Sequence, residues 1–168
     1  KQVGDQYGIP HRFPNVHTLL DKVTVDIIAV CVPVQFHADI ALAALDAGKH
    51  VFIEKPLTVT LEEADSIHER AKQVDRMVLV GFNFRWHRLI REARAMLQQG
   101  VVGKVEMIRS VFASVHEAPS EWQRHRASGG GAIFDQAIHV FDLWRFMLES
   151  EVEEVFAISR SGPWDDET

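Results

Sequence analysis

Three short apolar runs, separated by helix-type patterns, constrain the fold of this chain more than any other feature. The runs are residues 25–32 (VDIIAVCV), 51–54 (VFIE) and 77–82 (MVLVGF), and many of their residues are β-branched. Near-continuous apolar runs are typical of strands that are buried on both faces of a parallel sheet. The sequence therefore predicts three adjacent parallel strands, at residues 25–32, 51–54 and 78–82.

The segments between these runs have the pattern of helices. Residues 37–48 (HADIALAALDAG) are Ala-rich and end at Gly48, and glycine is common just past a helix end. In residues 60–74, Thr60 and Glu63 have the spacing of a capping box, and apolar residues follow at helical spacing. Alternation of strand and helix predicts an α/β fold with right-handed crossovers.

The pattern changes after Phe84, where we place a domain boundary. Residues 87–100 predict an amphipathic helix that ends at Gly100, and the alternation in residues 105–115 predicts a half-exposed strand. Residues 132–148 (AIFDQAIHVFDLWRFML) are apolar around most of a helix, which predicts a well-buried helix. A further strand is predicted at residues 152–159. We thus expect a partial Rossmann-type domain at 1–84 and a partial α+β domain, with a mostly antiparallel open sheet, at 85–168.

Three ionisable residues interrupt the apolar helix. Asp135, His139 and Asp142 lie at i, i+4 and i+7, which places them on one helix face. Ionisable groups on a buried helix cost free energy unless they are paired or used. Three interpretations stay open at this point: a polar stripe paired with Arg145 or facing a groove, a histidine held by an aspartate as a general acid or base, and a metal site.

A charged segment, Glu54-Lys55-Pro56, follows the middle predicted strand. In open α/β sheets, ligands bind outside the carboxyl ends of the strands, so Lys55 is a site candidate as well as a candidate surface charge. Pro56 can fix a turn, in a cis peptide if the turn requires one. The residues that follow the other two predicted strands are Pro33, His37, Asn83 and Arg85.

The glycine-rich segment and the single cysteine give weaker evidence about function. Gly129 to Gly131 lead into the apolar helix and permit either close ligand approach or a flexible turn, whereas G-x-G-x-x-G and G-K-[ST] motifs are absent from the 168 residues. Cys31 is the single cysteine, so an intrachain disulfide is excluded. We expect it to be a small buried hydrophobe.

Charge and hydropathy restrict the partners and the compartment. The net charge of −6 argues against nucleic-acid and anionic-membrane partners, which select for excess Lys and Arg. No apolar segment approaches the roughly 18 residues of a transmembrane helix. Residues 1–14 are polar and Gly-rich, unlike a signal peptide, so we expect a cytoplasmic protein.

Four stretches occur together: residues 25–37, 44–57 (ALDAGKHVFIEKPL), 80–87 (VGFNFRWH) and 128–147 (SGGGAIFDQAIHVFDLWRFM). In this order they resemble the NAD(P)-dependent oxidoreductases of the glucose–fructose oxidoreductase, inositol dehydrogenase and rhizopine-catabolism family. The resemblance spans nearly the whole chain. The pairing of AGKHVFIEKP with GGGAIFDQAIH is its most specific part.

The resemblance implies oxidation of a sugar, polyol or related alcohol, with Lys55, Asp135 and His139 as catalytic residues. The alcohol loses a hydride, for which a nicotinamide is the acceptor, and a proton, which His139 would take. Lys55 would stabilise the developing alkoxide. Asp135 would orient or help charge His139, or bond a second hydroxyl, while Asp142 is interpreted as structural.

The resemblance also implies where the cofactor lies. Its expected neighbours are Pro33, His37, Glu54, Pro56, Asn83 and Arg85. In the family a phosphate loop and an acidic residue for the adenine ribose would precede Lys1, so NAD and NADP are not distinguished. The substrate domain is expected to continue past Thr168 as an antiparallel sheet, and the chain alone is expected to be inactive. The family also suggests a homo-oligomer.

Two other functions are compatible with the same residues. A metal-dependent hydrolase or lyase would use Asp135, His139 and Asp142, but it needs further ligands that no clear spacing supplies. A non-catalytic sugar-binding relative would keep the fold without the chemistry.

Overall fold

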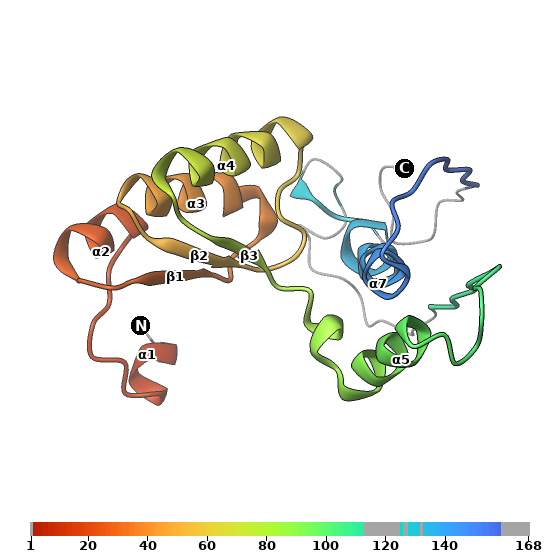
Figure 1. The fold of residues 1–168 in the computed structure, drawn as a ribbon. Helices are drawn as coiled ribbons and strands as arrows, with labels where there is room; N and C mark the ends of the chain where they lie inside the picture. The colour runs from red at the N-terminus through yellow and green to blue at the C-terminus, as the bar shows by residue number, and fades with distance from the viewer. Residues whose placement is uncertain (1, 113–124, 126–127, 132, 159–168) are drawn as a thin grey trace.

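The computed structural model describes residues 2–112, 125, 128–131 and 133–158, and shows two halves side by side (Figure 1). The first half contains α1 (Gln2–Gln6), α2 (Val16–Lys22), β1 (Ile27–Val30), η1 (Val34–Phe36), α3 (His37–Asp46), β2 (His50–Ile53), α4 (Leu61–Val74) and β3 (Val78–Val80). The second contains η2 (Asn83–Trp86), α5 (Arg88–Gln98), the π-helical turn η4 (Ile133–Ala137) and α7 (Ile138–Leu148). Within this part of the chain, no helix is both long and apolar enough to cross a membrane.

The sheet has the predicted order and direction. β1, β2 and β3 are adjacent and parallel, with Ile27 opposite His50 and Val51 opposite Val78. β1 and β3 are shorter than predicted, and β2 begins and ends one residue earlier than predicted. Ladder hydrogen bonds continue past the strand ends: the Glu54 amide donates to the Val30 carbonyl at 3.0 Å. The prediction of three parallel strands in one sheet is therefore confirmed.

Helices α3 and α4 cover one face of this sheet (Figure 1), and the hydrophobic core lies between them and the strands. Leu45 on α3, Ile53 on β2 and Ile67 on α4 are at most 1% exposed. The capping box at the start of α4 is present, since the Thr60 hydroxyl accepts from the Glu63 amide and the Glu63 carboxylate accepts from the Thr60 amide. Both helix predictions are confirmed.

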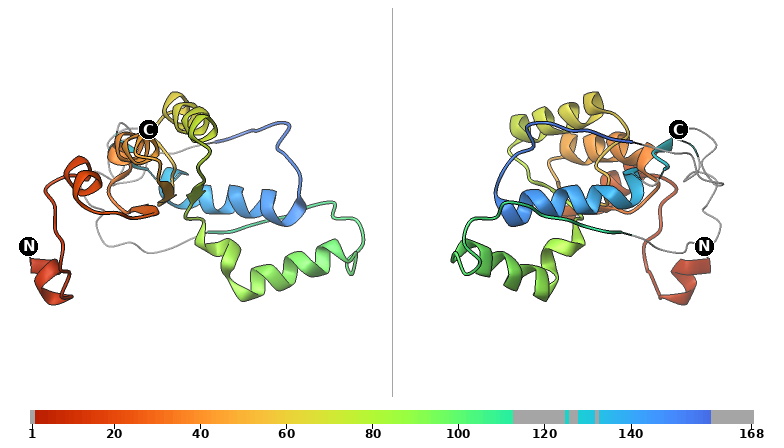
Figure 2. Two further views of the ribbon diagram at one scale, coloured as in Figure 1. Left: turned by 60° about the vertical axis from the view of Figure 1, so that its left-hand side comes forward. Right: turned by 90° about the vertical axis from the view of Figure 1, so that its right-hand side faces the viewer.

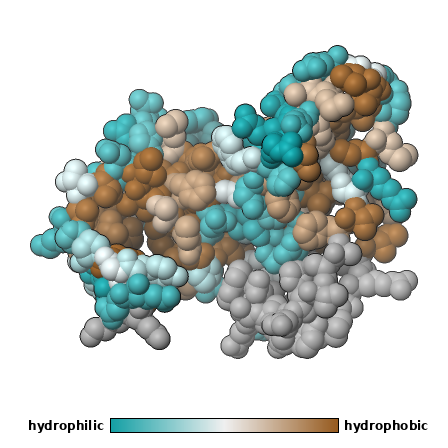
Figure 3. Space-filling view, turned by 90° about the horizontal axis from the view of Figure 1, so that it is seen from below, coloured by the Kyte–Doolittle hydropathy of each residue, from teal (hydrophilic) through white to brown (hydrophobic). Residues whose placement is uncertain are grey.

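The opposite face of the sheet is open, so the expectation of strands buried on both faces is wrong for the described residues. Ile27 is 60% exposed and Leu79 is 52% exposed. Seen from below, hydrophobic side chains gather over the sheet (Figure 3). The reason is that the strand order runs in one direction, and two right-handed crossovers in one direction return on the same face.

Cys31 is exposed, which corrects the expectation that it is buried. Side chains alternate along a strand, and β1 buries Ile28 and Val30 against the helices. Continuing this alternation, Cys31 falls on the open side with Ile27. Cys31 is therefore exposed even though its neighbours in the sequence are hydrophobic.

In the second half, α5 packs against α7 (Figure 2), and the predicted helix at residues 87–100 is present as Arg88–Gln98. The predicted strands at 105–115 and 152–159 are wrong for residues 105–112 and 152–158, which carry no strand; residues 113–115 and 159 lie outside the described residues. An alternating segment becomes a strand only when another strand pairs with it, and none among the described residues does so.

The expectation that residues 132–148 form a well-buried helix is also wrong. Its buried side chains are His139 and Asp142, at 8% and 6% exposure, whereas Ile133 and Phe141 are 57% and 45% exposed. The polar face is the one that packs against the rest of the protein. The cause is a set of cationic and aromatic partners that the end of β2 and the chain after β3 supply to that face.

Candidate functional site

Lys55 and Asp135 meet between the two halves, although they are 80 residues apart in sequence. Lys55 lies just past the carboxyl end of β2, and Asp135 lies in η4. The Lys55 ammonium donates to the Asp135 carboxylate at 2.7 Å and to the Asp135 main-chain carbonyl at 2.6 Å. The two side chains are 17% and 30% exposed, so this ion pair is largely shielded from water.

A buried histidine supports the turn that carries Lys55. The Lys55–Pro56 peptide is cis, and His37, at the start of α3, is 1% exposed. Its Nδ1 lies 3.0 Å from the Pro56 carbonyl oxygen and 3.2 Å from that of Leu57, and its Nε2 lies 2.9 Å from the Val32 carbonyl oxygen. His37 therefore joins the chain after β1 to the chain after β2.

His139 lies on α7, one turn after Asp135, and faces two aromatic rings. Its ring centroid is 4.6 Å from that of Phe84, with 37° between the planes, and 6.3 Å from that of Phe82, in an edge-on arrangement. Its Nδ1 is buried and has no hydrogen-bond partner among the residues that the structure describes.

The surroundings of His139 favour the neutral imidazole. Burial, and secondly the positive charge of Lys55, lower the pKa of His139 from its ordinary value of 6.5. The carboxylates of Asp135, Asp142 and Glu54 oppose this change and raise the pKa less. An imidazole with a lowered pKa is unprotonated at neutral pH and can accept a proton.

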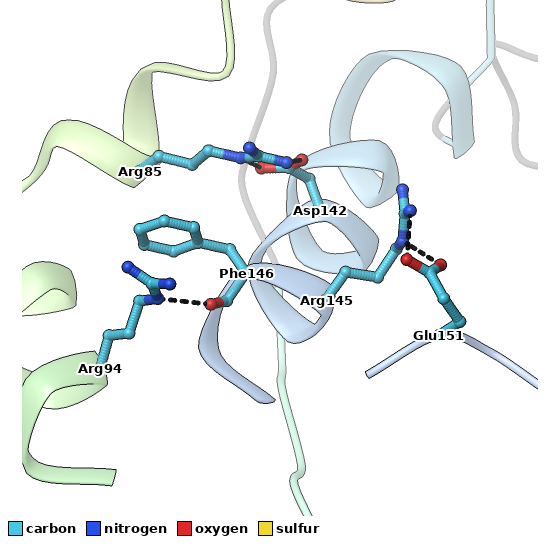
Figure 4. Close-up of polar contacts among 6 residues, drawn as sticks. All are labelled: Arg85, Arg94, Asp142, Arg145, Phe146 and Glu151. Carbon is cyan, nitrogen blue, oxygen red and sulfur yellow. Dashed lines mark hydrogen bonds and ion pairs between the residues drawn. The ribbon is translucent and has the colours of Figure 1, made fainter. Parts of the chain in front are cut away.

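Arg85 and Asp142 fix α7 against the turn after β3 (Figure 4). The guanidinium binds the carboxylate through two nitrogens: Nε donates to Oδ2 at 2.8 Å, and Nη2 donates to Oδ1. Asp142 is 5% exposed and Arg85 is 40% exposed at the side chain. The hydrogen bond to Asp142 raises the pKa of Arg85, so the guanidinium stays charged. This geometry supports the interpretation of Asp142 as structural.

Further contacts hold α7 to its neighbours (Figure 4). Arg94 on α5 donates to the Phe146 carbonyl at 2.9 Å, and its guanidinium lies 4.4 Å from the centre of the Phe146 ring. Arg145 binds Glu151, with both distances at 2.7 Å. The interpretation in which Arg145 pairs with the polar stripe is therefore wrong, because Arg145 binds Glu151, and Asp142 binds Arg85 instead.

The glycine-rich segment before η4 packs closely on the first half. Gly129 and Gly130 are buried, and Gly129 has φ +80°. A Cβ at Gly129 would lie 2.1 Å from Cγ1 of Val34, in η1. A side chain does not fit there, so this glycine serves contact between two parts of the protein.

The other predicted site residues lie around the carboxyl ends of the strands. Pro33 and Glu54 are half-buried, Pro56 is buried and Asn83 is exposed. Glu54 lies beside Gly81: a Cβ added to Gly81 would lie 3.4 Å from the carboxyl carbon of Glu54. A role for these residues in binding the cofactor stays a prediction.

Sequence analysis missed Phe82 and Phe84, which contact His139. The signal was present, because residues 82–86 (FNFRW) alternate an aromatic residue with a polar one at the end of a strand. The alternation marks Asn83 and Arg85 as polar positions, whereas hydrophobic residues at the end of a strand are usually part of a core.

The metal interpretation finds less support in this geometry. The described residues contain no group of three or more His, Cys, Asp or Glu side chains arranged to hold a metal ion. Asp135 and Asp142, two of the three candidate ligands, each face a cation, Lys55 and Arg85 respectively.

Comparison with known proteins identifies the family. Residues 1–82 match "Oxidoreductase family, NAD-binding Rossmann fold" and residues 90–167 match "GFO/IDH/MocA C-terminal domain". The chain belongs to the GFO/IDH/MocA oxidoreductase family. The predicted resemblance is thus confirmed, and the stretch between the two matches contains η2, the turn that carries Phe84 and Arg85.

Relatives within the GFO/IDH/MocA family include sugar and polyol dehydrogenases. The chain is 33% identical over 157 residues to myo-inositol 2-dehydrogenase of Thermotoga maritima, covering 94% of this chain and 46% of that protein. It is 28% identical over 148 residues to levoglucosan dehydrogenase of Pseudarthrobacter phenanthrenivorans, covering 85% and 38%. The chain thus spans less than half the length of these relatives.

Solved structures in the GFO/IDH/MocA family share the fold. An NAD-binding protein from Listeria innocua matches with a TM-score of 0.80 and 30% identity, over 89% of this chain and 44% of that one. An inositol dehydrogenase homologue from Azotobacter vinelandii, in complex with NADH and myo-inositol, matches with a TM-score of 0.76 and 36% identity, over 87% and 41%. The Rossmann-type α/β fold expected from the sequence is confirmed.

Proposed function

We propose that this chain carries the catalytic residues of an oxidoreductase that transfers a hydride between a sugar or polyol alcohol and NAD or NADP. The observation that supports this most is the shielded Lys55–Asp135 pair, which lies at the carboxyl end of a parallel strand and whose two charges both act on His139. This is the edge at which open α/β sheets bind ligands. The inositol and levoglucosan dehydrogenases among the relatives support a polyhydroxylated substrate.

The residues present fit a nicotinamide at this edge. When bound, the cofactor supplies the hydride acceptor, which no side chain can be. Pro33, Glu54 and Asn83 follow three neighbouring strands and would hold it there. His37 is buried with both ring nitrogens against carbonyls, and Arg85 binds Asp142, so we propose that these two act through the turns that they hold.

Lys55 is arranged to stabilise negative charge on a substrate oxygen. An ammonium has three hydrogens to donate, and Asp135 accepts two of them through its carbonyl and carboxylate oxygens. The third is left to donate to the alcohol oxygen as it gains alkoxide character. Because Lys55 is 17% exposed, this donor is already oriented and poorly screened, which is the condition for strong transition-state stabilisation. Asp135 thereby fixes the position of Lys55.

His139 takes the alcohol proton in this proposal. Its Nδ1 is buried, which leaves Nε2 as the nitrogen for a substrate. The lowered pKa keeps the imidazole unprotonated at neutral pH, so it accepts the hydroxyl proton during oxidation and returns it in the reverse direction.

Replacing Lys55 by Met tests the proposal, because Met keeps most of the stem and removes the charge. In the whole protein, turnover should fall by about 10²- to 10³-fold, the scale for losing one such donor. Cofactor affinity, measured by nicotinamide fluorescence, should change much less. Lys49→Met, in the turn before β2, is the matched control and should keep turnover. Near-normal turnover in Lys55→Met would show that the Glu54–Pro56 segment is only a turn.

The pH dependence of alcohol oxidation tests the role of His139. The active form is unprotonated and its pKa lies below 6.5, so the rate should hold at neutral pH and fall only as the pH drops below 6.5. His139→Gln should lower turnover and remove this acid limb. An unchanged limb in the variant would assign the ionisation to another group.

We further propose four general properties of the protein. These are a domain boundary near Phe84, a cytoplasmic location, a homo-oligomeric assembly, and the absence of nucleic-acid and membrane partners. The turn between β3 and α5 supports the first, and the net charge of −6 supports the last. Size-exclusion chromatography with light scattering tests the assembly.

A further inference from the structure

The imidazole of His139 is enclosed by aromatic rings from one short turn. Phe82 lies just after β3 and Phe84 lies in η2, so both rings come from the connection between β3 and α5 rather than from α7 itself. Phe84 lies over the imidazole at 4.6 Å, and Phe82 meets it edge-on at 6.3 Å. At these distances and angles the rings are in contact with the imidazole rather than merely near it.

A catalytic histidine is usually oriented by a hydrogen bond to the ring nitrogen that does not face the substrate. For His139 that bond is missing within the described part of the chain, because its buried Nδ1 has no partner. The nearby carboxylate of Asp135 binds Lys55 and the side chain of Gln136. Among the described residues, the contacts that orient the imidazole are therefore packing contacts with aromatic rings.

We propose that Phe84 is a positioning residue for His139, which sets the plane of the imidazole by stacking on it and keeps water away from it. The inference rests on the proposed function for its catalytic meaning, while the stacking itself does not. The ring limits rotation of the imidazole about its bond to the side chain. It thus holds Nε2 toward a substrate in place of a hydrogen-bonded carboxylate.

Among the described residues, the charged groups that face His139 come from three elements. Lys55 and Glu54 face it from the end of β2, Asp135 from η4, and Asp142 from α7 itself, where Arg85 pairs with it. Substitution of Phe84 leaves all these groups in place. A change in the ionisation of His139 in such a variant therefore reports on the loss of the ring.

The first measurement is an NMR titration of His139 in the whole protein without substrate, which needs no activity. In Phe84→Ala, water reaches the imidazole and its pKa should rise toward 6.5, because burial is the largest cause of its lowered value. Phe84→Tyr keeps the ring and should keep the wild-type pKa. Trp86→Ala is the matched control, since Trp86 lies in the same turn but is 69% exposed.

The second measurement is turnover with a polyol. Phe84→Ala should lower kcat by about 10- to 100-fold, with a much smaller change in KM, because a small misplacement of a reacting group can cost about 10²-fold. Phe84→Leu keeps an apolar cover without a flat ring, so it should keep the low pKa and still lose turnover. Phe84→Tyr and Trp86→Ala should retain turnover.

The outcomes separate the two proposals. A wild-type pKa and normal kcat in Phe84→Ala, or normal kcat in Phe84→Leu if the alanine variant does not fold, would overturn the positioning role. A raised pKa with normal kcat would also overturn it, because the ring would then exclude water without orienting the imidazole. If the wild-type protein transfers no hydride, the proposed function fails, and the NMR titration still decides the stacking.

Discussion

The two halves of this molecule are held by different forces. In the first half, every buried hydrophobic side chain lies between Ile28 and Ala71, in and around the sheet and helices α3 and α4. In the second half, the buried side chains among the described residues are His139 and Asp142. One half is ordered by non-directional burial of hydrocarbon, the other by a few directional contacts between charges and rings.

This difference explains which parts of the molecule depend on exact contact geometry. A hydrophobic core spreads its stabilisation over many contacts, so it tolerates changes that keep its volume. The face of α7 depends on one bidentate ion pair, Arg85–Asp142, and on the lysine that reaches η4. Each of these contacts fixes the position of α7 or η4 beside the candidate site, so few other residues could replace the ones that make it.

The largest stability effect should come from the first half. Ile53→Ala removes a side chain that is 0% exposed at the centre of the sheet, and should lower the free energy of unfolding by about 2–5 kcal/mol. Leu89→Ala on α5, where the side chain is 54% exposed, should change it by at most about 0.5 kcal/mol. Urea unfolding of the whole protein measures both. Similar losses in the two variants would contradict the view that burial of apolar side chains stabilises the first half more than the second.

An intermediate and unequal effect is expected at Arg85 and Asp142. Arg85→Met leaves a carboxylate at 5% exposure without its partner, and should destabilise by about 1–3 kcal/mol, a value reduced because Arg85 is 40% exposed. Asp142→Asn removes the buried charge itself and should cost less. A double-mutant cycle followed by urea unfolding measures the coupling. A larger loss in Asp142→Asn would contradict the view that the buried carboxylate depends on Arg85.

The smallest effect should come from Arg145 and Glu151, which pair at the far end of α7 with side chains that are 51% and 77% exposed. Glu151→Gln should leave the melting temperature unchanged within error, because exposed ion pairs contribute little. A clear drop would mean that charge pairing supports the second half well beyond the candidate site.

Much of the first half could be predicted from the sequence, because its information is local. Apolar runs specified three parallel strands, and Thr60 with Glu63 specified the start of α4. The open face was missed because a run that is apolar at every position does not say which face is covered. Cys31 was misplaced for the same reason.

The second half was harder to predict because its information is non-local. Helical spacing showed that Asp135, His139 and Asp142 share a face, and position at a strand end singled out Lys55. Which face of α7 is buried depends on Arg85, 57 residues from its partner in sequence. The stacking of Phe84 on His139 depends on how η2 packs against α7, which no periodicity reveals.

Gly129 sets how closely those halves meet. Because Gly129 has no side chain, the loop before η4 packs directly on Val34. A Cβ added to Gly129 would lie 2.1 Å from Cγ1 of Val34. The Lys55–Asp135 contacts, at 2.6 and 2.7 Å, bridge the same two halves, so a side chain at Gly129 that pushed the loop away from Val34 would disturb them. The alignment of the candidate site therefore depends on a position at which the chain has no side chain.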